Sequence, residues 1–235
     1  MSLCGYAPAM RTAAILPVKR FAHDKRRLGA SVAEELRDEL ARAMVGDVLA
    51  ALSETASIER TIVVTREDSV ATAARRLGAL VVRDTAEESQ SAAVALGVAR
   101  ALAEGFERVL CIPGDCPALD SAELDSLLDA PDAPEVTIVP DRHGTGTNGL
   151  LLTPPDAIAP SFGPDSCERH QALARRAGAG CRIERPASLL LDIDTGADLA
   201  ALRQRLSGGR ARASRTRAVL GQREPTELPS ITNTG

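Results

Sequence analysis

Short apolar stretches alternate along the chain with longer segments in which apolar residues recur every three or four positions. The apolar stretches are rich in β-branched and aliphatic residues, which favours strands. We expect strands at 12–18, 60–65, 79–83, 108–115, 135–140, 148–153, 181–184 and 188–193. Helical spacing predicts helices at 31–52, 69–77, 89–105, 121–130, 166–178 and 196–206. Strands that alternate with helices in this way predict an α/β fold with a mostly parallel sheet.

Local signals add detail to this pattern. Gly105 is expected to end the helix at 89–105, and Ser121 is expected to cap the next helix. The glycine-rich turn at 144–146 is expected to join the strands on either side of it as a pair. Because the strands are apolar along their whole length, we expect helices on both faces of the sheet. The expected architecture is therefore a Rossmann-like, three-layer α/β/α fold.

The predicted elements divide the 235 residues into one domain and two flanking segments. We expect residues 12–206 to form the domain and residues 1–11 to be a flexible N-terminus. Residues 207–235 are rich in Arg, Ser and Gly and show no apolar period, so we expect a disordered tail. Its five arginines could contact an acidic partner, although a solvated tail is the better interpretation.

The composition argues against several classes of function. A formal net charge of −4, with no Trp, one Tyr and three Phe, argues against nucleic-acid binding. The five cysteines form no Cys-x-x-Cys pair, so we expect reduced thiols in the cytoplasm rather than a zinc site or a disulfide framework. We find no apolar run long enough to span a membrane and no secretory leader, so we expect no membrane association.

The loop at 16–29, directly after the first strand, is strongly basic. Ligands of open α/β sheets bind beyond the carboxyl ends of the strands, which is where this loop is expected to lie. Its cations are Lys19, Arg20, Lys25, Arg26 and Arg27. Such cations neutralise phosphates and stabilise charge on a leaving group, which indicates a polyphosphate ligand. In an arbitrary loop a solvated turn would be the better interpretation. Neither the P-loop motif nor Gly-x-Gly-x-x-Gly is present.

Three aspartates stand at the ends of predicted strands. Asp115 ends the stretch CIPGD, and Asp192 and Asp194 end LLLDID. Side chains two residues apart in a strand point to the same side, so Asp192 and Asp194 can face one spot, where Asp115 could join them. Clustered carboxylates repel one another unless a cation lies among them, and oxygen ligands select Mg²⁺ or Mn²⁺. The simpler roles are a turn residue for Asp115 and an N-cap of the last helix for Asp194.

Cations for a triphosphate and carboxylates for Mg²⁺ together indicate metal-assisted nucleotidyl transfer. The metal would bridge phosphate oxygens and offset the charge of the departing pyrophosphate. No nucleophilic Ser or Cys is needed, because an anionic oxygen of the second substrate can attack.

Five motifs occur in a set order and carry a family resemblance. They are LPVKRFAHDKRRL, IPGDCP, GTNGLLL, FGPDS and LDIDTGADL. In this set the chain resembles the guanylyltransferases of coenzyme F420 biosynthesis, which join GTP to 2-phospholactate or phosphoenolpyruvate. The resemblance covers residues 12–206 and implies the Rossmann-like nucleotidyltransferase fold of that family.

The resemblance also implies roles for particular residues. Those implied to contact GTP are Leu16 and Pro17, beside the nucleotide, and Lys19, Lys25 and Arg27, on its phosphates, with Lys25 catalytic. Asp115, Asp192 and Asp194 would hold Mg²⁺ and act in catalysis. Thr147, Gly163 and Ser166 would bind the small phospho-acid, with Asn148 adjacent, and a helix N-terminus at 163–166 suits an anion. Relatives carry Leu-Asn before the long helix, where this chain has EESQSA, so Gln90 would replace the base-binding amide and makes the choice of guanine less secure.

Several alternatives stay open. Phosphoenolpyruvate is favoured as the acceptor because the alanine- and arginine-rich composition is typical of bacterial relatives that use it. The sequence does not separate it from 2-phospholactate or 3-phosphoglycerate. The chain could instead be another nucleotidyltransferase, of the molybdenum-cofactor guanylyltransferase or cytidylyltransferase type, or a nucleotide-binding regulatory protein without catalysis. The resemblance further implies a downstream transferase of the F420 pathway as a partner and suggests a homodimer.

Overall fold

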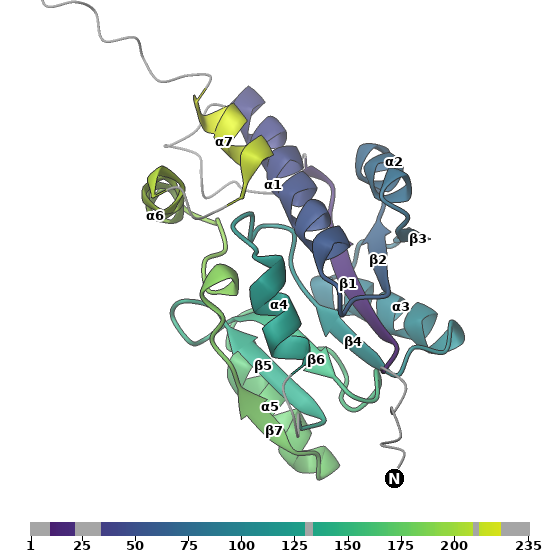
Figure 1. Ribbon diagram of the computed structural model, residues 1–235. Coiled ribbons are helices and arrows are strands. Elements are labelled where there is room, and N and C mark those ends of the chain that lie inside the picture. The colour runs from purple at the N-terminus through teal and green to yellow at the C-terminus, as the bar shows by residue number, and fades with distance from the viewer. Residues whose placement is uncertain (1–9, 22–33, 130–133, 209–211, 222–235) are drawn as a thin grey trace, which may run out of the picture.

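Seven strands form a single sheet in the computed structural model, which describes residues 10–21, 34–129, 134–208 and 212–221 (Figure 1). The order of the strands across the sheet is β3-β2-β1-β4-β6-β5-β7. The strands are β1 (Thr12–Val18), β2 (Arg60–Thr65), β3 (Leu80–Arg83), β4 (Arg108–Cys111), β5 (Val136–Pro140), β6 (Thr147–Leu152) and β7 (Cys181–Ile183). Each of them overlaps a segment predicted to be a strand, and β6 begins one residue earlier than expected, at Thr147.

All strands except β6 run in one direction. β1 pairs in parallel with β2 and β4, β2 with β3, and β5 with β7. β6 lies between β4 and β5 and is antiparallel to both. The mostly parallel sheet and the pairing of β5 with β6 are therefore confirmed. The reversal of β6 places its first residues at the same edge as the carboxyl ends of the other strands.

Helices cover both faces of the sheet, which confirms the three-layer α/β/α architecture (Figure 1). The helices are α1 (Glu34–Glu54), α2 (Asp68–Arg76), α3 (Gln90–Ala103), α4 (Ser121–Leu128), α5 (Ser166–Ala177), α6 (Gly196–Ser207) and α7 (Ser214–Gly221). Apolar residues of α1, α2 and α4 pack on one face, and those of α3 and α5 pack on the other. Alternate residues of β1 supply the two cores, because successive side chains of a strand point to opposite faces. None of the described helices has the length and apolar character needed to cross a membrane.

Two helix boundaries show how local sequence sets the elements. Gly105 adopts a φ of +74° just beyond α3, as expected for a glycine that ends a helix. The cap of α4 is Asp120 and not Ser121, which is a correction of one residue. The carboxylate of Asp120 accepts hydrogen bonds from the amides of Ala122 and Glu123, and an aspartate is as good a cap as a serine.

The expectation of a strand at 188–193 is wrong. The structure has a short 3-10 helix at Ala187–Leu189, followed by residues that pair with no strand. The backbone there bonds to the loop after β4 instead, where the amide of Ile193 donates to the carbonyl of Asp115 at 3.0 Å. Leu191 and Ile193 are nevertheless buried, whereas Asp192 and Asp194 are half-buried. The alternation of buried and half-buried residues is therefore present in this segment. Its backbone, however, forms a hydrogen bond with a loop and not with a strand of the sheet.

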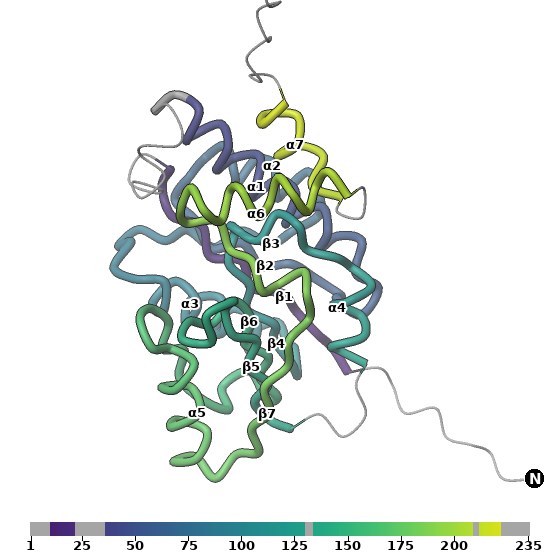
Figure 2. The backbone as a smooth tube through the Cα atoms, turned by 90° about the vertical axis from the view of Figure 1, so that its left-hand side faces the viewer, coloured from purple at the N-terminus to yellow at the C-terminus, as the bar shows by residue number. Residues whose placement is uncertain are grey.

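The predicted disordered tail contains a helix, so that expectation is wrong for residues 214–221. α7 packs against α1 and lies near α6 (Figures 1 and 2). Val219 and Leu220 are buried in a cluster with residues of α1 and α6. The carboxylate of Asp47, in α1, accepts hydrogen bonds from the first amides of α7, those of Arg215 and Thr216. An isolated helix of this length is unstable in water, so α7 depends on this packing. Of the predicted flexible termini, residues 1–9, 209–211 and 222–235 lie outside the described residues, whereas Arg11 is described and donates hydrogen bonds to Glu59 and Glu107.

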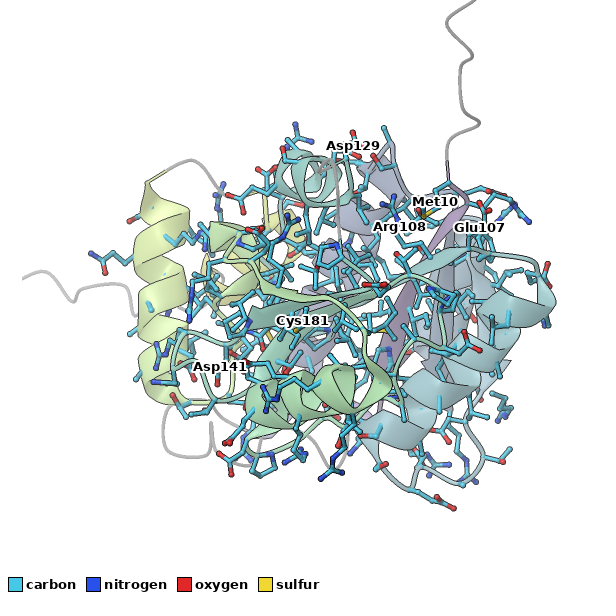
Figure 3. The ribbon with its side chains drawn as sticks, turned by 90° about the horizontal axis from the view of Figure 1, so that it is seen from below. Met10, Glu107, Arg108, Asp129, Asp141 and Cys181 are labelled. Carbon is cyan, nitrogen blue, oxygen red and sulfur yellow. The ribbon has the colours of Figure 1, made fainter. Side chains whose placement is uncertain are left out.

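A buried arginine closes the end of the sheet where β1 and β4 begin. Arg108 is 8% exposed and donates to the hydroxyl of Thr12 at 2.9 Å and to the carbonyl of Leu128 at 2.7 Å. Figure 3, a view from below, labels Arg108 together with Met10, and Asp129 lies near them. Because side chains fill this end, a ligand site is expected at the opposite, carboxyl edge.

We predict that Leu220→Ala lowers the free energy of unfolding by about 2–4 kcal/mol, because it leaves a cavity between α7 and α1. Leu220 is 8% exposed. Leu102→Ala is the matched control, since Leu102 is also helical but 42% exposed. Chemical denaturation followed by circular dichroism measures both changes. Equal losses of stability in the two variants would show that α7 does not contribute to the folded domain.

Candidate functional site

Two adjoining cavities open at the carboxyl edge of the sheet, and they share a wall. The shared wall consists of Gln90, Pro113, Asp115 and Asp194. We call the cavity that also contacts α1 the α1 cavity, and the one that reaches the start of α5 the α5 cavity. Their junction lies next to β1 and β4, which are neighbours in the sheet. After β1 the chain continues to β2 on one side of this pair, and after β4 it continues to β5 on the other side. Such a switch point is where open α/β sheets bind ligands.

The predicted aspartates meet at this junction. Asp115 and Asp194 line both cavities, and Asp192 lines the α5 cavity. The backbone bond from Ile193 to Asp115 holds the two segments together. Asn148, at the start of β6, donates from Nδ2 to the carbonyl of Leu189 at 2.8 Å and to Oδ1 of Asp192 at 3.2 Å. The amide of Asn148 therefore orients Asp192 in addition to lining the α5 cavity.

The environment of Asp192 disfavours its charged form. Burial raises the pKa of Asp192, and the nearby charges of Asp115 and Asp194 raise it further, while the hydrogen bond from Asn148 opposes these effects. A cation at the junction would remove this repulsion. No group of three or more His, Cys, Asp or Glu side chains among the described residues is placed to hold a metal ion. Mg²⁺ commonly takes only one or two carboxylates and completes its shell with water and substrate phosphates, so the aspartates fit that kind of site.

Asp194 is not the cap of α6, which removes the simpler role considered for it. The cap is Thr195, whose hydroxyl accepts from the amide of Asp198 while the Asp198 carboxylate accepts from the amide of Thr195. Burial alone would raise the pKa of Asp198, but hydrogen bonds from Thr195 and Asp194 and the charge of Arg142 lower it overall. Arg142 lies 2.6 Å from the Asp198 carboxylate and so ties the β5–β6 turn to this segment.

The α5 cavity contains a helix N-terminus that suits an anion. Thr147, Gly163 and Ser166 all line it, together with Asn148. Gly163 has a φ of +107°, which a residue with a side chain rarely adopts, so the turn before α5 requires glycine. The first turn of α5 is thus brought to the cavity, where the helix dipole favours negative charge. The amides of Ser166 and Cys167 already donate to the carbonyls of Gly163 and Thr145.

Two residues of α5 hold the loop that precedes this helix. Arg169 donates to the carbonyls of Ser161, Phe162 and Pro164 and to the hydroxyl of Ser161. His170 is completely buried and contacts Ser161 and Thr147. Burial lowers the pKa of His170 to about 4, and the charge of Arg169 contributes, so the ring is neutral at pH 7.

The α1 cavity contains part of the predicted nucleotide site. Pro17, Lys19 and Gln90 line it. Leu16 is fully buried in the core and does not reach the cavity with its side chain. Lys25 and Arg27, and most of the basic loop, lie outside the described residues.

The sequence reasoning missed two further aspartates that line the cavities. Asp84 lies in the α1 cavity and Asp141, labelled in Figure 3, in the α5 cavity. Each follows the end of a strand, β3 or β5, just as Asp115 follows β4. The rule that selected Asp115 would therefore have found both. Asp84 is 5% exposed, and its Oδ1 accepts from the amide of Glu87.

The chain is similar to known guanylyltransferases along nearly its whole length. Residues 12–215 match the family described as "Guanylyl transferase CofC like". The chain is 48% identical over 215 residues to the phosphoenolpyruvate guanylyltransferase of Conexibacter woesei, a match that covers 91% of this chain and 96% of that protein. It is 33% identical over 190 residues to the 2-phospho-L-lactate guanylyltransferase of Methanothermobacter thermautotrophicus, covering 81% and 83% respectively.

A solved structure shares the fold. It is described as a nucleotide-diphospho-sugar transferase from Desulfovibrio desulfuricans G20, and it matches with a TM-score of 0.72 at 19% identity over 91% of this chain and 95% of that chain. At this identity the likeness concerns the fold alone, and it confirms the expected nucleotidyltransferase fold. The family match and the relatives agree with the resemblance found in the motifs.

We predict that the folded state loses stability between pH 6.5 and 4 because of His170. The ordinary pKa is 6.5 and the folded value is about 4, so the unfolded chain takes up this proton first as the pH falls. The loss should reach about 2 kcal/mol at pH 5. His170→Gln removes the titrating group and should reduce the difference in unfolding free energy between pH 7 and pH 5 by that amount. An unchanged pH dependence would show that His170 does not carry it.

Proposed function

Because the chain belongs to the guanylyl transferase CofC-like family, we propose that it transfers GMP from GTP to the phosphate of phosphoenolpyruvate and releases pyrophosphate. The observation that carries this proposal is the position of Asp115 and Asp194 on the wall between two cavities. One cavity would take the nucleotide and the other the acceptor, so the reacting phosphates would meet at the aspartates. The greater similarity to a relative named for phosphoenolpyruvate than to one named for 2-phospho-L-lactate supports this acceptor.

The nucleotide is proposed to bind in the α1 cavity. Lys19 would contact the phosphates, and Lys25 and Arg27 of the same basic loop would add charge that stabilises the leaving pyrophosphate. Pro17 would contact the nucleoside, and Gln90 would offer an amide to the base. This arrangement would direct the α-phosphate toward Asp115, on the wall between the two cavities.

The acceptor is proposed to bind in the α5 cavity through its anionic groups. The hydroxyls of Thr147 and Ser166 would supply donors for a phosphate or a carboxylate, and the dipole of α5 would favour its negative charge. A phosphate oxygen of the acceptor then attacks the α-phosphorus of GTP. The bond from this phosphorus to the bridging oxygen breaks, and pyrophosphate leaves with that oxygen.

Asp115, Asp192 and Asp194 are proposed to hold Mg²⁺ together with phosphate oxygens, with one or two of the carboxylates bound directly and the remainder through water. The metal would supply positive charge to the phosphates of the leaving group. The raised pKa of Asp192 supports the proposal, since its causes after burial are the charges of the other two aspartates. The segment from Leu189 to Asp194, which is hydrogen-bonded to Asp115 and Asn148, would hold the carboxylates in place before substrates arrive.

The cellular setting is also proposed from the family. The product contains a phosphoanhydride, so a downstream transferase of coenzyme F420 biosynthesis would consume it. We expect the enzyme to act in the cytoplasm and to form a homodimer, which sedimentation of the purified chain would test.

A substrate panel tests the proposed function. The chain is incubated with Mg²⁺ and either GTP, ATP or CTP, and with phosphoenolpyruvate, 2-phospho-L-lactate or 3-phosphoglycerate. We expect pyrophosphate release and the mass of the guanylylated product for GTP with phosphoenolpyruvate above all other pairs. Faster turnover of another acceptor would reject phosphoenolpyruvate as the substrate. Absence of turnover with every pair would reject the transferase activity.

We predict that Asp192→Asn and Asp194→Asn each lower turnover by more than about 100-fold while the chain stays folded, because each removes a proposed ligand of Mg²⁺. In the absence of metal the melting temperature should hold or rise, since one of the repelling charges is lost. Asp156→Asn is the control, because Asp156 is exposed and outside both cavities. Turnover close to that of the wild-type chain in both variants would refute the metal assignment.

A further inference from the structure

His170 contacts Thr147, which lines the α5 cavity, with one ring nitrogen and the loop before α5 with the other. Nε2 lies 2.9 Å from the backbone amide nitrogen of Ser161, and Nδ1 lies 3.1 Å from the hydroxyl oxygen of Thr147. The ring of Phe162 packs edge-on against it, with centroids 5.1 Å apart and planes at 73°. His170 itself is 0% exposed and does not line the cavity, whereas Thr147 does. His170 can therefore affect a bound acceptor only through its neighbours.

The contacts of the ring determine where its proton lies. A backbone amide can only donate, so Nε2 must accept from Ser161 and carries no proton. A neutral imidazole has one proton, which is then on Nδ1. Nδ1 accordingly donates to the hydroxyl of Thr147, which accepts with a lone pair. The neutral state agrees with the pKa of His170, which burial lowers to about 4.

This bond restricts what the hydroxyl of Thr147 can do. A hydroxyl has one proton to donate and accepts through its lone pairs. Among the described residues, the hydroxyl of Thr147 forms its hydrogen bond with Nδ1 of His170. With a lone pair engaged by Nδ1–H, its proton remains available for an atom in the α5 cavity that accepts. An anionic oxygen of a phosphate or a carboxylate accepts and cannot donate, so it matches this arrangement.

We propose that His170 is a positioning residue that fixes Thr147 as a hydrogen-bond donor to an anionic oxygen of the acceptor. The inference rests on the proposed function, because it takes the α5 cavity as the acceptor site. The loop itself is held independently, since Arg169 binds three of its carbonyls. The distinctive contribution of His170 is thus the direction of the Thr147 hydroxyl.

Two substitutions separate the two sides of the ring. The amide of His170→Asn reaches the position of Nδ1 and can still donate to Thr147, but it loses Ser161. The amide of His170→Gln reaches the position of Nε2 and can still accept from Ser161, but it loses Thr147. We expect His170→Gln to raise KM for phosphoenolpyruvate by about tenfold and KM for GTP by less than about twofold, as for one lost hydrogen bond to the acceptor. His170→Asn should recover most of the loss. Equal effects of both variants on both KM values would overturn the inference.

A double-mutant cycle tests the route through Thr147. Thr147→Val should raise KM for phosphoenolpyruvate, and adding His170→Gln to Thr147→Val should raise it by less than about twofold more. Additive effects would show that His170 acts by another route. If the wild-type chain neither binds phosphoenolpyruvate in calorimetry nor turns it over, the proposed function and this inference are both overturned. If the wild-type chain turns over normally but the effects of the two substitutions on KM are additive, this inference alone is overturned.

A spectroscopic measurement tests the tautomer without any functional variant. The chain has three histidines, and nitrogen-15 spectra of their rings distinguish protonation at Nδ1 from protonation at Nε2. The spectrum of His170→Gln, or that of His143→Gln and His23→Gln if the former does not fold, assigns the signal. We expect His170 to be protonated at Nδ1 at pH 7. Protonation at Nε2, or at both nitrogens, would overturn the inference.

Discussion

The hydrogen bond from the amide of Ile193 to the carbonyl of Asp115 joins two segments that are far apart in the sequence and carry all three aspartates of the site. It forms because Leu191 and Ile193 are buried in a cluster with α1, α6 and α7. That packing holds the carboxylates of the segment next to Asp115 against their mutual repulsion. α7 belongs to the same cluster, so a helix far from the cavities in sequence helps to keep the aspartates in place.

The cost of this arrangement is visible at Asp192. Its raised pKa results from burial and from the charges of Asp115 and Asp194, so the folded chain without a cation holds unfavourable electrostatic energy at the junction. Asn148 offsets part of it by donating to Oδ1 of Asp192. Groups with such shifts concentrate where proteins bind ions or carry out chemistry. The repulsion among these carboxylates destabilises the folded chain without a cation. A cation bound together with a triphosphate would remove that repulsion.

The sequence was sufficient to predict the elements whose apolar pattern is long, and the site residues that directly follow such elements. β1, β2 and β4 were predicted from their buried runs, and Asp115 followed from the end of β4. The segment at 188–193 was misassigned because burial alternates in it as in a strand, while its backbone partner is a loop that sequence does not reveal. α7 was missed because eight residues with few apolar positions carry little periodicity, and its stability comes from α1. Asp84 and Asp141 could have been found by the rule used for Asp115, whereas the contact between His170 and Thr147 depends on how α5 packs on β6.

In the proposed assignment of the two cavities, the reversal of β6 would let one edge of the sheet serve two substrates. The parallel strands deliver loops at their carboxyl ends, and those after β1, β3 and β4 build the α1 cavity. β6 runs the other way, so its first residues, Thr147 and Asn148, reach the same edge within the sheet itself. Residues on a strand are held more rigidly than residues on a loop, so Thr147 and Asn148 are the firmly held part of the α5 cavity, whose other lining residues lie mostly in loops. The shared fold of distant nucleotidyltransferases does not fix the substrate. Under the proposed function, the choice of acceptor would lie in side chains such as Thr147 and in the residues, including His170, that direct them.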